Sequence, residues 1–301
     1  MHYMSREVLT PFGSLHVTAK DNDDFSYIIT NTKYSQLLLE NEYHICVAEP
    51  LVKQTTYRNA MFARGIYLNH HTGAPADLYY STERVNFQLR EPYNNAENLN
   101  DKIFWGYALK LYLTFRAVQT QALHLKGALV KSPANRLYLL LGRGGSGKST
   151  LSKALNKKGY QVLSNTHCIY KDHYIWGVNT WIRTRENKSE HMIEATDHNT
   201  ISNGALSGCY ILNEYNKNNF EINNIDQNSA VSWVLHFGNA IGNYDLKEDI
   251  IDIDPSNFNQ FDLLSQQLEL TFNFCKENSI QQLTLDAYDD RSLDLFIKIA
   301  Y

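Results

Sequence analysis

The sequence has little of what defines several protein classes. Its four cysteines are widely spaced and form no C-x-x-C pair, which argues against a disulfide framework or a structural zinc site. No apolar run near the N-terminus resembles a signal peptide. The longest apolar stretch, residues 103–118, is interrupted by Lys110, Thr114 and Arg116, so it is too polar to span a bilayer. We therefore expect a cytoplasmic protein that does not associate with membranes.

An excess of positive charge is also missing. The chain has 28 basic and 32 acidic residues, a net charge of −4, which disfavours binding of nucleic acid through a general electrostatic field. The 20 tyrosines and 13 phenylalanines are spread along the chain without interleaved basic residues, so they do not suggest a base-stacking surface. A hydrophobic content of 43% is that of an ordinary globular protein.

Two regions differ in their patterning. Residues 1–100 read as a β-rich N-terminal accessory region, with a helix-like stretch at 33–39 and strands expected at 14–19, 25–29, 43–47 and 84–89. Turn-forming residues at 91–95 mark the expected boundary. The second region, 101–301, begins with apolar residues at helical spacing, which predict an amphipathic helix over 101–119.

The most informative segment is a glycine-rich loop in the middle of the chain. An apolar strand at 137–141 leads into residues 142–150, which match G-x-x-x-x-G-K-[ST] at every fixed position. Helix-forming residues follow at 151–158 and stop at Gly159, the expected residue after a helix end. Strand, loop and helix occur in the order that a phosphate-binding loop requires.

Each residue type in this loop suits a nucleotide phosphate. Glycines allow successive backbone N–H groups to turn inward as an anion nest, and the helix N-terminus adds its positive end. Lys148 supplies a mobile charge for the β- and γ-phosphates, Ser149 a hydroxyl for Mg²⁺, and Thr150 a contact to the α-phosphate. The residues expected to bind nucleotide are Gly142, Gly144, Gly145, Ser146, Gly147, Lys148, Ser149 and Thr150.

The flanks of the loop carry a resemblance. The segment LHLKGALV at 123–130 precedes the loop, and GYQVLSN at 159–165 follows its helix. This order resembles the C-terminal domain of HPr kinase/phosphorylase and related proteins, in which an L-H-x-[SG] strand precedes the loop and G-[HY]-x-[LV]-[LV]-[SA]-[DN]-D follows. The likeness covers roughly residues 100–210. It implies an α/β fold, with a P-loop nucleotide-binding domain of the HPr-kinase and phosphoenolpyruvate-carboxykinase type behind the β-rich region.

The resemblance also assigns roles, with one departure. The acidic pair of the family falls at Asn165 and Thr166, neither of which is a carboxylate, and these two positions together with Ser149 are the expected magnesium contacts. His167 comes next and is the candidate catalytic base, because an imidazole with a pKa near 6.5 suits neutral pH. His124 matches the family's strand histidine beside the phosphates. Either histidine would otherwise be a structural residue of the sheet.

A pair of arginines completes the candidate site. Residues 180–185 resemble the family's R-x-[LI]-R-[LV]-[RK] segment, and they place Arg183 and Arg185 two positions apart. On a strand this spacing puts both guanidinium groups on one face, where they would clamp phosphate or an anionic substrate. The alternative is a pair of solvated arginines at a strand edge.

Two functions are open on this basis. The first is an ATP- and Mg²⁺-dependent phosphotransferase that phosphorylates a hydroxyl of a small molecule or peptide, with Lys148, His124, His167, Arg183 and Arg185 as catalytic residues. The second is a catalytically degenerate nucleotide-binding scaffold or regulator, which the missing carboxylates favour. A GTPase is disfavoured, because the nearest match to N-K-x-D, at 216–219, lacks the aspartate. The sequence leaves open whether the protein is a homo-oligomer.

Overall fold

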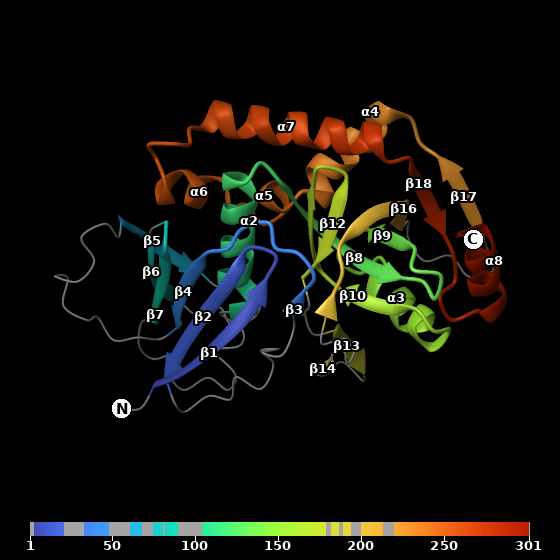
Figure 1. The fold of residues 1–301 in the computed structure, drawn as a ribbon, viewed down its shortest axis with the longest axis horizontal. Helices are drawn as coiled ribbons and strands as arrows, with labels where there is room; N and C mark the ends of the chain where they lie inside the picture. The colour runs from blue at the N-terminus through green and yellow to red at the C-terminus, as the bar shows by residue number, and fades with distance from the viewer. Residues whose placement is uncertain are drawn as a thin grey trace.

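Two large β-sheets, two small two-stranded sheets and the helices around them make up the described part of the fold, a mixed α/β structure (Figure 1). The computed structural model describes residues 3–20, 33–47, 61–67, 75–80, 82–89, 104–178, 182–186, 189–193, 200–212 and 220–300. The strand expected at 25–29 and the boundary turn at 91–95 lie outside these residues. Within them, no helix has both the length and the apolar content to cross a membrane.

The first sheet forms the N-terminal region. Its six strands lie in the order β1-β2-β4-β7-β6-β5, with bounds Tyr3–Thr10 (β1), Gly13–Lys20 (β2), Glu42–Val47 (β4), Met61–Tyr67 (β5), Pro75–Tyr80 (β6) and Arg84–Leu89 (β7). The strands expected at 14–19, 43–47 and 84–89 are thereby confirmed.

The helix expected at 33–39 is wrong. The segment begins with strand β3 (Lys33–Tyr34), which pairs in parallel with β15 (Thr200–Ile201). Further along, the backbone N–H of Leu38 donates to the carbonyl of Pro11, 2.6 Å away. Backbone groups that a helix would satisfy within one turn are instead bonded to distant segments, so tertiary pairing overrides the local pattern.

The helix expected at 101–119 is present as a π-helical turn η3 (Phe104–Ala108) followed by α2 (Leu109–Gln119). Rather than one apolar and one solvated face, α2 is buried almost all round, Thr114 and Arg116 included. The reason is that α2 packs against both the N-terminal sheet and strand β8 of the second sheet. Figure 1 shows it standing between the two.

The second sheet has eight strands, namely β8 (Leu123–Lys131), β9 (Leu137–Leu141), β10 (Gln161–Ser164), β11 (His167–Lys171), β12 (Tyr174–Gly177), β16 (Gly204–Leu212), β17 (Glu221–Asn224) and β18 (Ile280–Thr284). Strands β9, β16 and β18 are parallel neighbours. Strand β8 runs antiparallel to β9 and also to β10 and β11. The remaining hairpin, β13 (Ile182–Glu186) with β14 (Ser189–Ile193), forms a separate two-stranded sheet.

Helices cover both faces of this sheet and join it to the first. Their bounds are Lys148–Lys157 (α3), Gln227–Trp233 (α4), Val234–Gly238 (π-helical η4), Ala240–Asn243 (α5), Lys247–Ile253 (α6), Gln260–Glu277 (α7) and Asp290–Ala300 (α8). One core lies between the sheet and α4 with α7, and a second lies between the opposite face and α3 with α8. A third core joins the N-terminal sheet to α2, α5 and α6.

That third core generates a prediction about cooperativity. Leu15 of β2 is fully buried in it, so Leu15→Ala should lower the free energy of unfolding by about 2–5 kcal/mol. All four tryptophans lie beyond residue 100. If the core couples the two regions, the urea transition followed by tryptophan fluorescence should shift together with that followed by far-ultraviolet circular dichroism.

The control is Thr18→Ala, a half-buried position on the other face of the same strand, which should shift the transition by less than about 0.5 kcal/mol. A fluorescence transition that Leu15→Ala leaves unchanged would show that the N-terminal sheet unfolds independently.

Candidate functional site

The glycine-rich loop connects the buried strand β9 to helix α3. Residues Gly145 and Gly147 have φ of +83° and +89°, a backbone conformation that residues other than glycine rarely adopt. Helix α3 begins at Lys148, and the N–H of Leu151 donates to the carbonyl of Gly147 over 2.8 Å. The predicted order of strand, loop and helix is confirmed, and the end of α3 before Gly159 is as expected.

The loop closes tightly on itself at its start. A Cβ atom on Gly142 would collide with Oγ of Ser146, and that hydroxyl is buried without a hydrogen-bond partner. A side chain at 142 would therefore require Ser146 to change its rotamer. Around Gly144, by contrast, an added Cβ meets nothing within 4 Å, so the middle of the loop borders open space.

Lys148 lies folded back over the loop. Its Nζ donates to the carbonyl oxygens of Gly142 and Arg143, at 2.6 and 2.9 Å. Burial, followed by the positive charge of Lys126, lowers the pKa of Lys148 to about 8. The ammonium group is thus held by backbone dipoles alone, at the place where a phosphate group would be a stronger partner.

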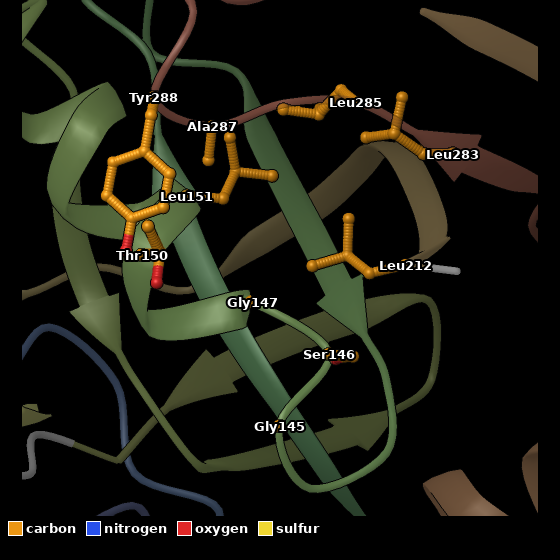
Figure 2. Close-up of a pocket in the computed structure, with 10 residues that line it drawn as sticks. All are labelled: Gly145, Ser146, Gly147, Thr150, Leu151, Leu212, Leu283, Leu285, Ala287 and Tyr288. Atoms are coloured by element: carbon orange, nitrogen blue, oxygen red, sulfur yellow. The ribbon is translucent and has the colours of Figure 1, made fainter. Parts of the chain in front are cut away.

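An apolar pocket adjoins the loop. It has a volume of about 290 Å³ and is lined by Gly145, Ser146, Gly147, Thr150, Leu151, Leu212, Leu283, Leu285, Ala287 and Tyr288. The loop follows the carboxyl end of β9, Leu212 ends β16, and the last four residues come from the end of β18 and its continuation. Figure 2 shows the ring of Tyr288 beside Thr150, with leucine side chains across the pocket. The carboxyl edge of parallel strands is where open α/β sheets bind ligands.

His124 on β8 and His167 on β11 form a buried pair. Nε2 of His124 lies 3.0 Å from Nδ1 of His167, and Nδ1 of His124 lies 2.8 Å from Oγ1 of Thr114 on α2. Each histidine is 2% exposed. Both ring nitrogens of His124 are therefore engaged within the protein, which leaves no direct contact from His124 to a phosphate in this arrangement.

Burial and nearby positive charge keep this pair neutral. Burial, with a contribution from Lys110, lowers the pKa of His124 to about 3. Burial, then His124, Lys110 and Lys126, hold the pKa of His167 well below its usual value. Both effects disfavour the protonated form of each imidazole, because the rings are buried and positive charges lie nearby.

The three expected magnesium contacts differ in their burial and in their hydrogen bonds. The side chain of Asn165 is 5% exposed, and its Oδ1 has no hydrogen-bond partner. Thr166 accepts a backbone hydrogen bond from Gly127, 3.0 Å long, and Ser149 is half-buried in the first turn of α3. Among the residues that the structure describes, no three His, Cys, Asp or Glu side chains come together as a metal site.

Arg183 and Arg185 lie on β13, opposite Met192 and Glu190 of β14. The hairpin lies outside the eight-stranded sheet, and β13 contacts α3, the helix that follows the glycine-rich loop.

Sequence reasoning did not select several residues that the fold brings to the site. Lys126 lies between the loop and His167, because it pairs with His167 across β8 and β11 while its neighbour Gly127 pairs with Leu141, the last residue of β9. Its position two residues after His124 on a predicted strand was a usable signal, since such residues share a face. The pocket wall at 283–288 offered no such signal, because it lies about 140 residues from the loop.

No family model matches this chain, and no curated protein sequence matches it either. The indications of function are therefore the loop, its pocket and the polar groups beside them. All three lie around the carboxyl end of β9 and the middle of β8.

The histidine pair generates a prediction about stability. An unfolded chain protonates both imidazoles near pH 6.5, whereas the folded protein holds them neutral to lower pH. The contribution to stability is thus present above pH 6.5 and is lost as the pH falls. The free energy of unfolding should decrease below pH 6.5 with a slope approaching about 2.7 kcal/mol per pH unit, two protons' worth.

Urea unfolding between pH 4.5 and 7.5 measures this slope. His167→Gln should remove about half of it, whereas His236→Gln, at an exposed position, should leave it unchanged. The same slope in wild-type protein and in His167→Gln would contradict the neutral, buried assignment.

Proposed function

We propose that the protein is an ATP- and Mg²⁺-dependent phosphotransferase that transfers the terminal phosphoryl group to a hydroxyl of a small molecule or peptide. We further propose that its second region is a P-loop domain of the HPr-kinase and phosphoenolpyruvate-carboxykinase type. One observation carries the proposal. The glycine-rich loop, the N-terminus of α3 and an apolar pocket meet at the carboxyl edge of three parallel strands.

The size and polarity of the pocket suit a nucleoside. A volume of about 290 Å³ between leucines, with Tyr288 at its rim, offers apolar contact and an aromatic ring on which a base stacks. Thr150 lines the pocket on the first turn of α3, beside the ring of Tyr288 (Figure 2), so an α-phosphate would reach it when the β- and γ-phosphates occupy the loop. The ammonium of Lys148 then exchanges two carbonyl partners for phosphate oxygens.

Magnesium fits two of the expected residues. The orphaned Oδ1 of Asn165 is a neutral oxygen donor, and Ser149 provides the hydroxyl of the loop motif. When bound, the ion would neutralise charge that develops on the transferred phosphoryl group. Because neither side chain is anionic, we expect the phosphates and water to supply most of its ligands.

His167 remains the proposed base, provided that its Nε2 carries no proton. If Thr114 donates to His124, the chain of hydrogen bonds leaves a proton on Nε2 of His167, which then accepts nothing. If every direction is reversed, Nδ1–H of His167 donates to His124, and Nε2 keeps its lone pair. Only the second arrangement lets Nε2 take the hydroxyl proton as the acceptor oxygen bonds to the γ-phosphorus and the bond to ADP breaks.

The lowered pKa makes His167 a weak base. Phosphoryl transfer through a loose transition state demands little from the base, and positioning and charge supply most of the rate. In this scheme His124 is a positioning residue that fixes the tautomer of His167, and Arg183 with Arg185 remain candidates for acceptor binding or transition-state charge.

The second candidate is a nucleotide-binding regulator without transfer activity. The absence of carboxylates at Asn165 and Thr166 favours it, since an amide and a hydroxyl hold a metal ion less strongly than two carboxylates. Both candidates require nucleotide binding and differ only in transfer.

Lys148→Ala tests the shared requirement. Loss of the cation that neutralises the β- and γ-phosphates should weaken ATP·Mg²⁺ binding at least about tenfold in a calorimetric titration. The matched control is Lys157→Ala, which removes the same charge from the exposed end of the same helix and should leave the affinity unchanged. Equal affinities in the wild type and the Lys148 variant would exclude the loop as a phosphate site.

Transfer is measured separately. Protein, Mg²⁺ and γ-labelled ATP are incubated with a fractionated extract, and label that moves to an acceptor in the wild type but not in Lys148→Ala supports the kinase. Nucleotide binding without any labelled acceptor favours the regulator.

The lowered pKa of Lys148 predicts a pH dependence. Above pH 8 the Lys148 side chain of the free protein has lost its proton. The nucleotide phosphates favour the protonated form, so ATP binding requires the uptake of a proton. ATP affinity should therefore fall by up to about tenfold per pH unit above pH 8, a range in which ATP itself is fully ionised. Titrations between pH 7 and 9.5 in two buffers of different ionisation enthalpy measure both the affinity and the proton uptake. Lys148→Arg should bind without this dependence, and a flat profile in the wild type would contradict the prediction.

A further inference from the structure

Helix α7 carries an apolar stripe on its outer side. Among the described residues, eight large apolar side chains are strongly exposed, and half of them lie on this helix, at 83%, 46%, 50% and 44% for Phe261, Leu264, Leu268 and Phe272. Successive spacings of three, four and four residues keep them on one face of the helix. The opposite face of α7 is buried in the apolar cores, so the stripe points away from them.

The exposed apolar area of this stripe is large. If a side chain of this size has a surface of about 200 Å², the four exposed fractions amount to roughly 450 Å². Single exposed apolar side chains are ordinary, whereas a contiguous patch of about 300–600 Å² often marks an interaction site. Figure 1 shows α7 along the upper edge of the molecule, where its whole length lies at the periphery of the fold.

The order of side chains along the stripe is the same in both directions. From either end of α7 it reads phenylalanine, leucine, leucine, phenylalanine. When two copies of α7 pack side by side in opposite directions, Phe261 of one copy lies against Phe272 of the other, and Leu264 lies against Leu268. A two-fold axis between the leucines generates all of these contacts, so the stripe is complementary to itself, as a symmetric dimer interface requires.

The charges beside the stripe suit the same orientation. Asp262 lies in the first turn of α7 and Lys276 in the last, both exposed and on the same side of the stripe. An antiparallel pair brings the aspartate end of each copy to the lysine end of the other, and a helical lysine side chain leans toward the N-terminus of its helix, here toward the aspartate. A parallel pair would instead place each charge beside its own kind, which is unfavourable.

We propose that the stripe of α7 is the interface through which two copies of this chain form an antiparallel, two-fold symmetric dimer. Two stripes offer roughly 900 Å² of apolar surface, and the polar side chains that flank them bring the total toward the 1,200 Å² or so of a small specific interface. An interface of this size favours a dimer in equilibrium with its monomer over an obligate one. The proposal does not depend on nucleotide binding or on phosphoryl transfer.

The oligomeric state of the full chain tests the interface. Sedimentation equilibrium between about 1 and about 100 μM should show a monomer–dimer equilibrium with a dissociation constant near or below about 10 μM. Leu264→Glu and Leu268→Glu should each raise this constant at least about hundredfold, because a dimer contains every substitution twice.

The matched control is Leu295→Glu, a leucine of similar exposure on α8, which should leave the dissociation constant unchanged. Because all three leucines are exposed, circular dichroism should show the same fold in every variant. A wild type that stays monomeric at the highest concentration, or a dimer that survives both substitutions on α7, would overturn the proposal.

Cysteine cross-linking tests the orientation of the two helices. Phe261→Cys and Phe272→Cys, mixed and oxidised, should form a disulfide between the two different chains. Neither variant should cross-link to itself, because like positions of an antiparallel pair lie about 16 Å apart along the helix axis. A disulfide spans only about 4–7 Å between Cα atoms. A parallel pair would give the reverse pattern and would contradict the proposed dimer.

Two further controls complete this test. The wild type, oxidised in the same way, accounts for the native cysteines, of which Cys168, Cys209 and Cys275 are buried. Flotation with phosphatidylcholine vesicles examines the other apolar surface that could cover the stripe. A monomeric wild type that floats with vesicles, while Leu268→Glu does not, would assign the stripe to a lipid surface and overturn the dimer.

Discussion

Strand β8 is hydrogen-bonded along both edges, to β9 on one side and to β10 and β11 on the other, and this double pairing sets the positions of the site. Pairing with β9 fixes where the glycine-rich loop leaves the sheet. Pairing with β11 fixes His167 opposite Lys126, and packing against α2 brings Thr114 to His124. A one-residue slip in either register would turn the histidine and the lysine to the opposite face and separate them from the loop. The N-terminal sheet contributes indirectly, because it shares its core with the helix that carries Thr114 and Lys110.

The electrostatic effects in this region all disfavour the protonated, positively charged forms of its basic groups. Cationic groups gather around a neutral histidine pair, and the positions that the resembled family fills with carboxylates hold Asn165 and Thr166. Neither of these side chains carries a negative charge, and burial first, then neighbouring positive charge, lowers the pKa of both imidazoles and of Lys148.

The parts of the site that are contiguous in sequence were predictable, and those assembled by pairing were not. The loop at 142–150 is recognisable from its glycines, whose backbone conformation the turn requires. The apolar strand before it and the helix after it are also evident from the local sequence. The periodicity at 101–119 predicts a helix but does not distinguish one buried on one side from one buried on all sides. The wall from Leu283 to Tyr288 depends on β18 lying beside β16 in parallel, an order that no local pattern specifies. At Lys33–Tyr34 a weak helical preference lost to pairing with a strand more than 160 residues away.

The contact between Lys148 and the carbonyls of Gly142 and Arg143 has a consequence for selectivity. The ammonium group serves as the loop's own resident ligand, so an incoming molecule competes with the protein for it. A small halide offers a single site of charge and gains little from the exchange, whereas a chain of phosphates engages the ammonium and the backbone N–H groups at once. A molecule that presents several oxygen atoms together would therefore compete for this ammonium group more effectively than a single halide ion, whatever contact it makes with the adjoining apolar pocket.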